Sequence, residues 1–321
     1  MSGSVAEALL FLSCDVVGST AYKQQNVEGW RETFLSFYRG FPQVLGDLTL
    51  EHQYGPGFEL WKVLGDEMLF FSRVRSEEDI CAAVSLWLKA MDKYETDYLR
   101  DTSLSTKGGG FIGTFPGPDS QSSIPRDPTT EVSDKGVVEL NHEAIKSSDG
   151  KKFLYDYFGP GIDTGFRVVA ASSQRLFTMT LEVAWAMLIC LWDKTHKHIE
   201  DHERALLFET RSLKGVWNGR EYPIFSIDRQ CADPVNAAIE GMMRQKPDVE
   251  AALKLCVACA ESAMWPSKLY HPNAKTKEFH EVPRDSLEAL PRGNSMEGAE
   301  SVPPDVRTGN ALPEDVPLGG N

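Results

Sequence analysis

The stretch FLSCDVVGST, residues 11–20, decides the fold. Together with the residues before it, it forms a short apolar run with β-branched members, which predicts a buried strand over Leu9–Val17. Asp15 stands close to the end of that strand, and the following Gly-Ser-Thr ends it and can begin a helix. The pattern therefore places a carboxylate at one edge of the expected sheet.

A second stretch, WKVLGDEMLFF at residues 61–71, predicts a hairpin. Its strands are expected at Phe58–Leu64 and Met68–Val74, with Asp66 in the turn between them. If the hairpin lies beside the first strand, Asp15 and Asp66 converge at one edge of the sheet. Facing carboxylates repel each other unless a cation lies between them, and Mg²⁺ or Mn²⁺ with phosphate oxygens would meet that need. From local sequence alone, a turn cap is the simpler interpretation of each aspartate.

A third stretch, YDYFGPGIDTGFRV at residues 155–168, combines a strand, a Gly-Pro-Gly turn and the start of a helix. The helix is expected over Ile162–Leu176, with Asp163 and Arg167 four residues apart on one face. This spacing suits an ordinary helix ion pair worth about 0.3–0.5 kcal/mol. It equally suits two side chains that are aimed at one ligand.

The remaining elements alternate irregularly, which favours a mixed α/β chain with antiparallel pairing rather than a doubly wound parallel sheet. Residues 116–134 are rich in Pro, Ser, Asp and Thr and are expected to form a long loop. The other expected elements are helices at Asn26–Leu48, Glu77–Tyr98 and Leu181–Trp192, strands at Lys107–Phe115, Phe153–Phe158 and Phe177–Thr180, and a hairpin formed by Phe208–Leu213 and Glu221–Ile227.

Charge and composition exclude several classes of partner. The chain has 321 residues, with 33 Lys+Arg against 47 Asp+Glu, so its formal net charge is −14. This balance argues against non-specific binding to nucleic acid or to anionic lipid. The most apolar run, Leu181–Trp192, is too short to span a bilayer, and Met1–Cys14 lacks the basic start of a signal peptide. Six cysteines, mostly isolated in apolar stretches, suit reduced thiols, so we expect a cytoplasmic protein without a membrane segment.

The C-terminal part of the chain differs in character from the rest. Residues Asp233–Met264 carry helical spacing, interrupted at Pro247. Seven of the 18 prolines fall in the last 50 residues, which favours disorder there. We therefore expect one domain over residues 7–229, a helical extension over 230–272 and a disordered tail over 273–321.

The three quoted stretches resemble, in the same order, the motifs of class III nucleotide cyclases. FLSCDVVGST is similar to the first metal-binding motif of that family. WKVLGDEMLFF is similar to its Lys-x-x-Gly-Asp hairpin, and YDYFGPGIDTGFRV to its Asp-x-x-Gly-x-x-Val-Asn-x-Ala-x-Arg stretch. The hairpin with Leu213-Lys214-Gly215 is similar to the family's closing hairpin, so the resemblance spans about residues 7–229.

The resemblance implies an α+β fold, with a ferredoxin-like, mixed or antiparallel sheet and flanking helices, and a role for each matching residue. Two Mn²⁺ or Mg²⁺ ions per active site would be held by the Asp15 and Asp66 side chains and the Val16 carbonyl. The metal residues would come from one subunit of a homodimer, and the arginine from the other, so that the active sites lie at the interface. The implied substrate residues are Lys62 and Asp156 at the base, Arg167 at the transition state, Lys214 at the polyphosphate and Asp163 at the position of the family's asparagine.

The departures from the family pattern narrow the expected substrate. Asp163 replaces the asparagine of purine cyclases, and the GPGIDTGFR string resembles the pyrimidine cyclases of bacterial Pycsar anti-phage systems. The expected reaction is UTP to 3′,5′-cyclic UMP and pyrophosphate, with the product acting on a separate effector. Cyclic CMP synthesis, adenylate cyclase activity and an inactive nucleotide-binding domain remain alternatives, because Lys62 and Asp156 fit several bases. Tyr54, a bulky residue beside the hairpin, is a candidate for shortening the base pocket.

Overall fold

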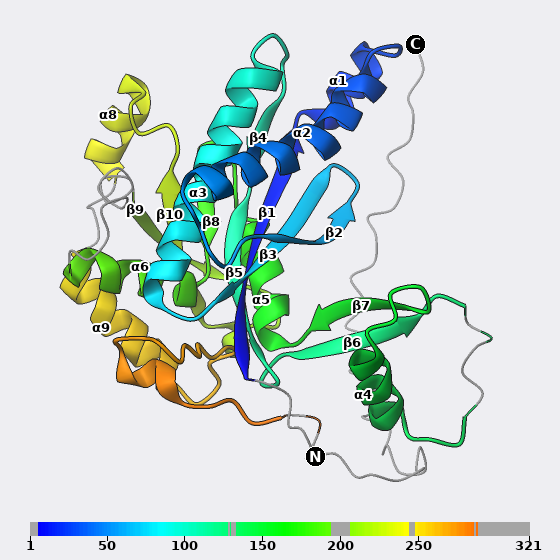
Figure 1. The fold of residues 1–321 in the computed structure, drawn as a ribbon. Helices are drawn as coiled ribbons and strands as arrows, with labels where there is room; N and C mark the ends of the chain where they lie inside the picture. The colour runs from blue at the N-terminus through cyan, green and yellow to red at the C-terminus, as the bar shows by residue number, and fades with distance from the viewer. Residues whose placement is uncertain are drawn as a thin grey trace, which may run out of the picture.

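The computed structural model describes residues 6–127, 129, 133–193, 206–243, 248–285 and 287. Within these residues, an eight-stranded sheet runs in the order β2-β3-β1-β5-β8-β10-β9, with β4 paired to β1 (Figure 1). All its pairs are antiparallel except the parallel pair of β5 and β8. The strands are β1 (Glu7–Val17), β2 (Glu59–Leu64), β3 (Glu67–Val74), β4 (Ser105–Lys107), β5 (Gly109–Phe115), β8 (Leu176–Met179), β9 (Leu206–Ser212) and β10 (Glu221–Asp228).

The first half of the chain builds a ferredoxin-like unit. The strands β1, β2, β3 and β5 follow one another in the sequence with helices after β1 and β3, and they lie in the spatial order β2-β3-β1-β5. This is the arrangement of a βαββαβ motif. Its helices are α1 (Ser19–Gln25), α2 (Trp30–Glu51) and α3 (Glu77–Tyr94), the last continued by a π-helical turn at Glu95–Leu99. The expected α+β fold with an antiparallel sheet and flanking helices is confirmed.

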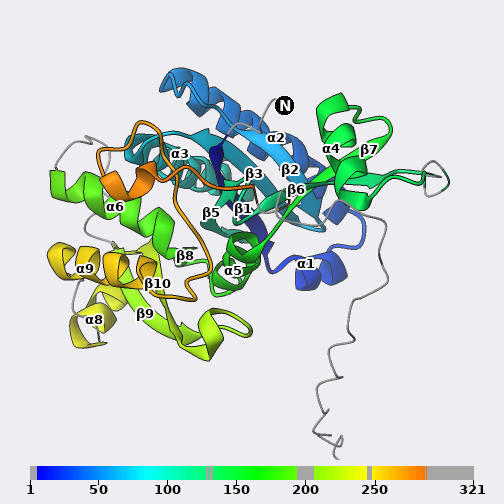
Figure 2. The same cartoon turned by 90° about the horizontal axis from the view of Figure 1, so that it is seen from below.

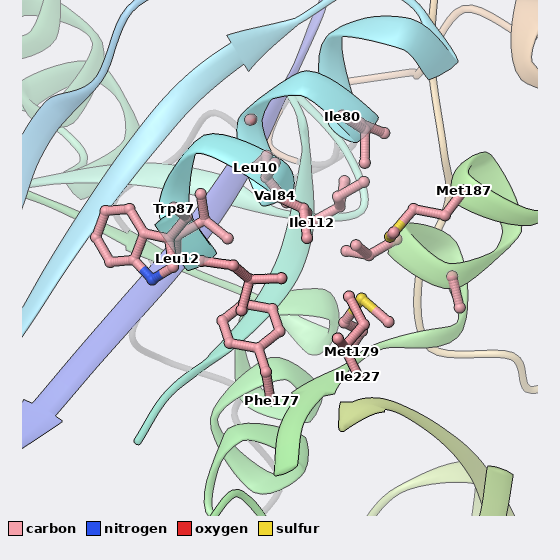
Figure 3. Close-up of a cluster of buried hydrophobic side chains, with 14 of the residues drawn as sticks. Leu10, Leu12, Ile80, Val84, Trp87, Ile112, Phe177, Met179, Met187 and Ile227 are labelled. Atoms are coloured by element: carbon pink, nitrogen blue, oxygen red, sulfur yellow. The ribbon is translucent and has the colours of Figure 1, made fainter. Parts of the chain in front are cut away.

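The two faces of the sheet are covered differently (Figure 2). The helices α2, α3 and α6 (Leu181–Asp193) pack on one face, here called the helical face, and form the large core with alternate residues of β1 such as Leu10 and Leu12. Figure 3 shows part of this core, in which the Trp87 indole reaches β1 and donates a hydrogen bond to the Ser13 carbonyl at 3.1 Å. The intervening residues of β1 project from the other face, here called the open face.

The open face carries a smaller aromatic cluster and the helix α5 (Pro160–Val169). This helix packs so closely against β5 that a Cβ on Gly165 would lie 2.2 Å from the Phe111 ring. A Cβ on Gly113 would likewise lie 2.8 Å from Ile162. Glycines in β5 and α5 therefore allow the helix to approach the strand. The helix ends earlier than the sequence pattern predicted.

A small arm projects from this unit (Figure 1). It consists of β6 (Ser120–Pro125), α4 (Val137–Ser147) and β7 (Phe153–Phe158), and the two strands form a separate antiparallel sheet. The strand β7 was predicted, but the expectation that residues 116–134 are only a loop is wrong. The strand β6 exists because it pairs with a distant strand, which its own composition does not reveal.

The C-terminal part packs against the domain through α9 (Val249–Ala260) and the segment that follows it, whereas α8 (Pro234–Met243) leaves Val235 and Met242 exposed (Figure 2). The Trp265 ring stacks on Tyr222 with 5.1 Å between ring centroids, and its indole donates to buried Glu182 at 2.8 Å. Phe279 is 1% exposed, and its ring meets Trp185 edge-on. The expected disorder from residue 273 is therefore wrong for residues 273–285, whereas Pro247 and residues 288–321 lie outside the described residues.

Two further findings bear on the expectations from composition. In the described part of the chain, no helix has the length and apolar character needed to cross a membrane. All six cysteines are free, and five of them are buried. Short 3-10 turns lie at Trp217–Gly219 and Lys277–His280.

Candidate functional site

Asp15 and Asp66 lie beside each other at one end of the sheet. In the ladder between β1 and β3, Asp15 is opposite Glu67, the residue that follows Asp66 in the hairpin. The Val16 amide donates a hydrogen bond to the Asp66 carbonyl at 3.3 Å, which ties the end of β1 to the hairpin tip. The structure thus brings together the two aspartates that the sequence placed at one edge.

The Asp15 side chain belongs to the open face, where it meets a lysine. Lys107 of β4 is opposite Asp15 in the antiparallel ladder, and its Nζ lies 3.3 Å from Asp15 Oδ2. Burial raises the pKa of the Asp15 carboxyl, and the positive charge of Lys107 opposes that shift. Asp66 adds a smaller contribution that raises the same pKa. The carboxylates are therefore close enough to repel each other.

Glu67 adds a third carboxylate to this end of the sheet. Burial raises its pKa, and the negative charges of Asp15 and Asp66 act in the same direction. The hairpin tip is held from the helical side by Tyr38 of α2, whose hydroxyl donates to the Gly65 carbonyl at 2.6 Å. The result is a fixed group of oxygen atoms with excess negative charge.

These oxygen donors suit Mg²⁺ or Mn²⁺. The Lys107 ammonium already lies against Asp15 as a cation, which shows that the site accepts positive charge. Among the described residues, no group of three or more His, Cys, Asp or Glu side chains is arranged to hold a metal. A metal bound by Asp15 and Asp66 would therefore need further oxygen ligands, such as the Val16 carbonyl and the phosphates of a substrate.

Lys62 and Asp156 form a second group on the open face. Lys62 Nζ lies 2.8 Å from Asp156 Oδ1 and 3.1 Å from Oδ2. The Trp61 indole and the Tyr157 amide also donate to Oδ1, at 2.8 and 2.9 Å. Lys62 Nζ lies 3.9 Å from the centroid of the Trp61 ring. Because Oδ1 receives three donors and Oδ2 one, Oδ2 keeps acceptor capacity for a ligand.

Asp163 and Arg167 lie on α5, with Asp163 exposed and Arg167 partly buried. The Arg167 guanidinium donates to the main-chain carbonyl of Asp163 at 2.7 Å. The ion pairs found among the described residues include none between these two side chains. Both charged groups therefore remain available to a ligand.

Asp119, in the turn before β6, holds the N-terminus of α5. Its side chain is fully buried, and Oδ1 accepts from the amides of Gly161 and Ile162 at 2.9 and 3.3 Å. Oδ2 accepts from the Thr114 amide at 3.0 Å. Burial raises the pKa of Asp119 to about 6, although the three amide donors oppose the shift. A Cβ on Gly161 would lie 2.6 Å from Oδ2, which explains the glycine there.

Two of the expected site residues lie elsewhere. Tyr54 is buried in the core on the helical face, and its hydroxyl contacts Ser72 at 2.8 Å. The prediction that Tyr54 lines a base pocket is therefore wrong. Lys214 is exposed in the β9–β10 hairpin, which the strand registers place at the opposite end of the sheet from Asp15.

The candidate residues of one chain thus form separate groups. Within the described part of the chain, no hydrogen bond or ion pair joins Asp15 or Asp66 to Lys62, Asp156 or Arg167. Sequence reasoning missed Lys107 and Asp119. The Gly-Pro-Gly turn was a signal for a close neighbour such as Asp119, but no local pattern pointed to Lys107.

No family model matches the chain, and no curated protein sequence matches it. Among solved structures it is similar to the adenylyl cyclase CyaB from P. aeruginosa, with 14% identity, a TM-score of 0.44 and coverage of 70% of this chain and 94% of that chain. It is also similar to the guanylate cyclase domain of RhGC from Catenaria anguillulae in complex with GTP. That likeness has 11% identity and a TM-score of 0.44, and it covers 70% of this chain and 98% of that chain.

Proposed function

We propose that the chain is a nucleotide cyclase of the class III type, which converts UTP to 3′,5′-cyclic UMP and pyrophosphate. The observation that carries the proposal is the juxtaposition of Asp15 and Asp66 at the end of the sheet, joined by the Val16–Asp66 hydrogen bond. A single motif could arise by chance. Here the Lys62–Asp156 pair and α5 also lie on the open face.

The reaction needs charge compensation rather than a protein nucleophile. The 3′-hydroxyl of the substrate loses its proton to water and its oxygen forms a bond to the α-phosphorus, the bond from that phosphorus to the bridging oxygen of the β-phosphate breaks, and pyrophosphate leaves with the electron pair. Mn²⁺ or Mg²⁺, two per site in the proposed arrangement, would lower the pKa of the hydroxyl and neutralise the leaving group. Asp15, Asp66 and the Val16 carbonyl would hold these ions.

Arg167 and Lys214 would supply the positive charge that the phosphates need. A guanidinium can donate to two phosphate oxygens at once, which suits charge that builds up in the transition state. Asp163, exposed beside Arg167, would accept a hydrogen bond from a ribose hydroxyl. These roles follow from the resemblance of the α5 stretch and the closing hairpin to the cyclase motifs.

We propose that each active site is shared between two copies of the chain. The support is that, in the described part of one chain, no hydrogen bond or ion pair joins Asp15 or Asp66 to Arg167, and that Lys214 lies at the far end of the sheet. The edge strand β2 also leaves Leu60 and Leu64 about half exposed, at 53% and 47%. Exposed apolar side chains on an edge strand favour association with a second copy.

Base recognition is assigned to Lys62 and Asp156. Uracil would accept from Lys62 through O4 and donate to Asp156 through N3–H. Trp61, which contacts both residues, would pack against the base. The preference for UTP over CTP or ATP rests on the resemblance of GPGIDTGFR to the pyrimidine cyclases, as do the proposed cytoplasmic role in anti-phage defence and the separate effector. Asp163 at the position of the family's asparagine supports the alternative of an inactive nucleotide-binding domain.

The test is to incubate the purified full chain with each of the four nucleoside triphosphates and Mn²⁺ and to identify the products by mass spectrometry. Cyclic UMP is expected with wild type and with Asp47→Asn, a control in the exposed part of α2. It should be lost in Asp66→Asn. Cyclic AMP as the main product would refute the pyrimidine assignment. Nucleotide binding without any cyclic product would favour the inactive alternative.

A further inference from the structure

Lys107 has no role in the reaction described so far, yet its position is tightly determined. The ladders of β4 and β5 on β1 share one register, because Asp15 is opposite Lys107 and Leu12 is opposite Gly110. Between them, a Cβ on Gly108 would lie 2.0 Å from the Ser13 carbonyl oxygen, so only glycine fits there. The backbone therefore fixes Lys107 directly across from Asp15.

The surroundings of Lys107 are acidic. Its Nζ lies 3.3 Å from Asp15 Oδ2, and its charge opposes the rise in pKa that burial causes at both Asp15 and Glu67. Asp66 raises the pKa of the same two carboxyls. Among the described residues, Lys107 is thus a positive group whose charge acts on both Asp15 and Glu67.

The contact is also loose enough to open. The Lys107 side chain is 36% exposed and that of Asp15 is 24% exposed, and ion pairs with this access to water contribute little net stability. A lysine side chain is flexible, and its ammonium can move into water without a large change in the backbone. Displacement of Lys107 by a stronger cation would therefore not disturb the sheet.

From this geometry we propose that Lys107 is a resident counter-ion that competes with the divalent cation for Asp15. This inference rests on the proposed metal site. In the metal-free chain Lys107 neutralises Asp15, and a divalent ion must displace it or bind against its charge. Lys107 thereby raises the free metal concentration at which the site fills, so that the site stays empty when the metal is scarce.

The test is a Mn²⁺ titration of the full chain without nucleotide, in which electron paramagnetic resonance measures the free ion. Lys107→Met keeps the length of the side chain and removes its charge, so Mn²⁺ should bind about tenfold or more tightly than in wild type. Lys107→Arg should remain near wild type because it keeps the charge. Lys151→Met, in the exposed turn of the arm, should also leave the affinity unchanged. Lys107→Gln serves as the neutral variant if the methionine form does not fold.

The outcomes separate this inference from the proposed function. If Asp15→Asn abolishes Mn²⁺ binding but the neutral Lys107 variants bind no more tightly than wild type, the competition is refuted while the metal site stands. If Asp15→Asn binds Mn²⁺ as wild type does, the metal site is misassigned and both proposals fail. Tighter binding in the neutral variants, absent in Lys107→Arg, supports the inference.

Discussion

Replacing Asp119 with alanine should destabilise the chain strongly, because this carboxylate holds the start of α5. The substitution leaves three buried main-chain amides without an acceptor, those of Thr114, Gly161 and Ile162. An unsatisfied buried donor costs about 1–3 kcal/mol, and the longest of the three bonds, 3.3 Å, contributes least. The expected loss is therefore about 4 kcal/mol, a large part of the roughly 5–15 kcal/mol of a typical folded domain.

The assay is urea unfolding followed by circular dichroism. Asp119→Asn should cost less than alanine, because its amide oxygen still accepts while its NH₂ faces one of the donors. Asp47→Ala, on the exposed surface of α2, should leave the free energy of unfolding within about 0.5 kcal/mol of wild type. A loss below about 1 kcal/mol for Asp119→Ala would show that water or a backbone shift satisfies the amides, and would refute the reasoning.

A double-mutant cycle makes the same prediction more specific. A Cβ at position 161 would lie 2.6 Å from Asp119 Oδ2, so Gly161→Ala should destabilise the wild-type chain. In the Asp119→Ala background that clash is gone, and the second substitution should cost about 1 kcal/mol less than it does alone. Equal costs in both backgrounds would mean that the carboxylate does not determine the glycine.

Three further predictions concern other parts of the chain. Gly165→Ala should lower the free energy of unfolding, measured with urea, by about 1–3 kcal/mol, because the added Cβ would lie 2.2 Å from Phe111. Gly46→Ala, in the exposed part of α2, is the control and should leave the free energy of unfolding unchanged or raise it. Burial lowers the pKa of His271 to about 4, so the stability that comes from keeping this histidine neutral is present above its unfolded pKa of about 6.5 and is lost as the pH falls towards 4. Between pH 4.5 and pH 7.5 the free energy of unfolding should therefore change by up to about 3 kcal/mol. The His271→Phe variant should lack this pH dependence. Trp61→Phe keeps an aromatic ring but removes the hydrogen bond that the Trp61 indole donates to Asp156. KM for the nucleotide should therefore rise about tenfold while the midpoint of thermal unfolding changes little. An unchanged KM would show that Trp61 does not take part in base recognition.

The central strands were predictable because their signals are local. The apolar run of β1 and the turn at Gly65, which has a φ of +65°, specify a buried strand and a hairpin without help from distant residues. Alternation then places Asp15 on the face opposite Leu12. The proximity of Asp15 and Asp66 followed from those two elements and from the assumption that they are neighbours, which the register confirms.

The arm was not predictable from its composition. The strand β6 is rich in serine and lacks a clear alternation, and it depends on pairing with β7 and on side-chain contacts from α4. Asn141 of α4 accepts from both the amide and the hydroxyl of Ser123, at 2.7 and 2.8 Å. These contacts join segments that are far apart in the sequence, so no local window contains the signal.

The same reason explains the errors at the candidate site. Tyr54 was expected to contact a ligand because its loop precedes the hairpin. In the structure its ring packs against Phe58, and its hydroxyl forms a hydrogen bond with the Ser72 hydroxyl in the core. Lys107 and Asp119 act on residues that lie far from them in the sequence. Their roles depend on strand register and on a buried turn, and neither is visible in a motif.

The shared active site is tested most directly by mixing two inactive variants. Asp66→Ala removes a metal ligand and Arg167→Ala removes the transition-state cation, so each should lower turnover about 10³-fold or more by itself. In a mixed dimer one site carries both lesions and the other carries none. At equal mixing about half of the dimers are mixed, so about a quarter of wild-type activity should return once subunit exchange is verified with two different tags. Verified mixed dimers that remain inactive would contradict the assignment of these residues to one site built from two chains.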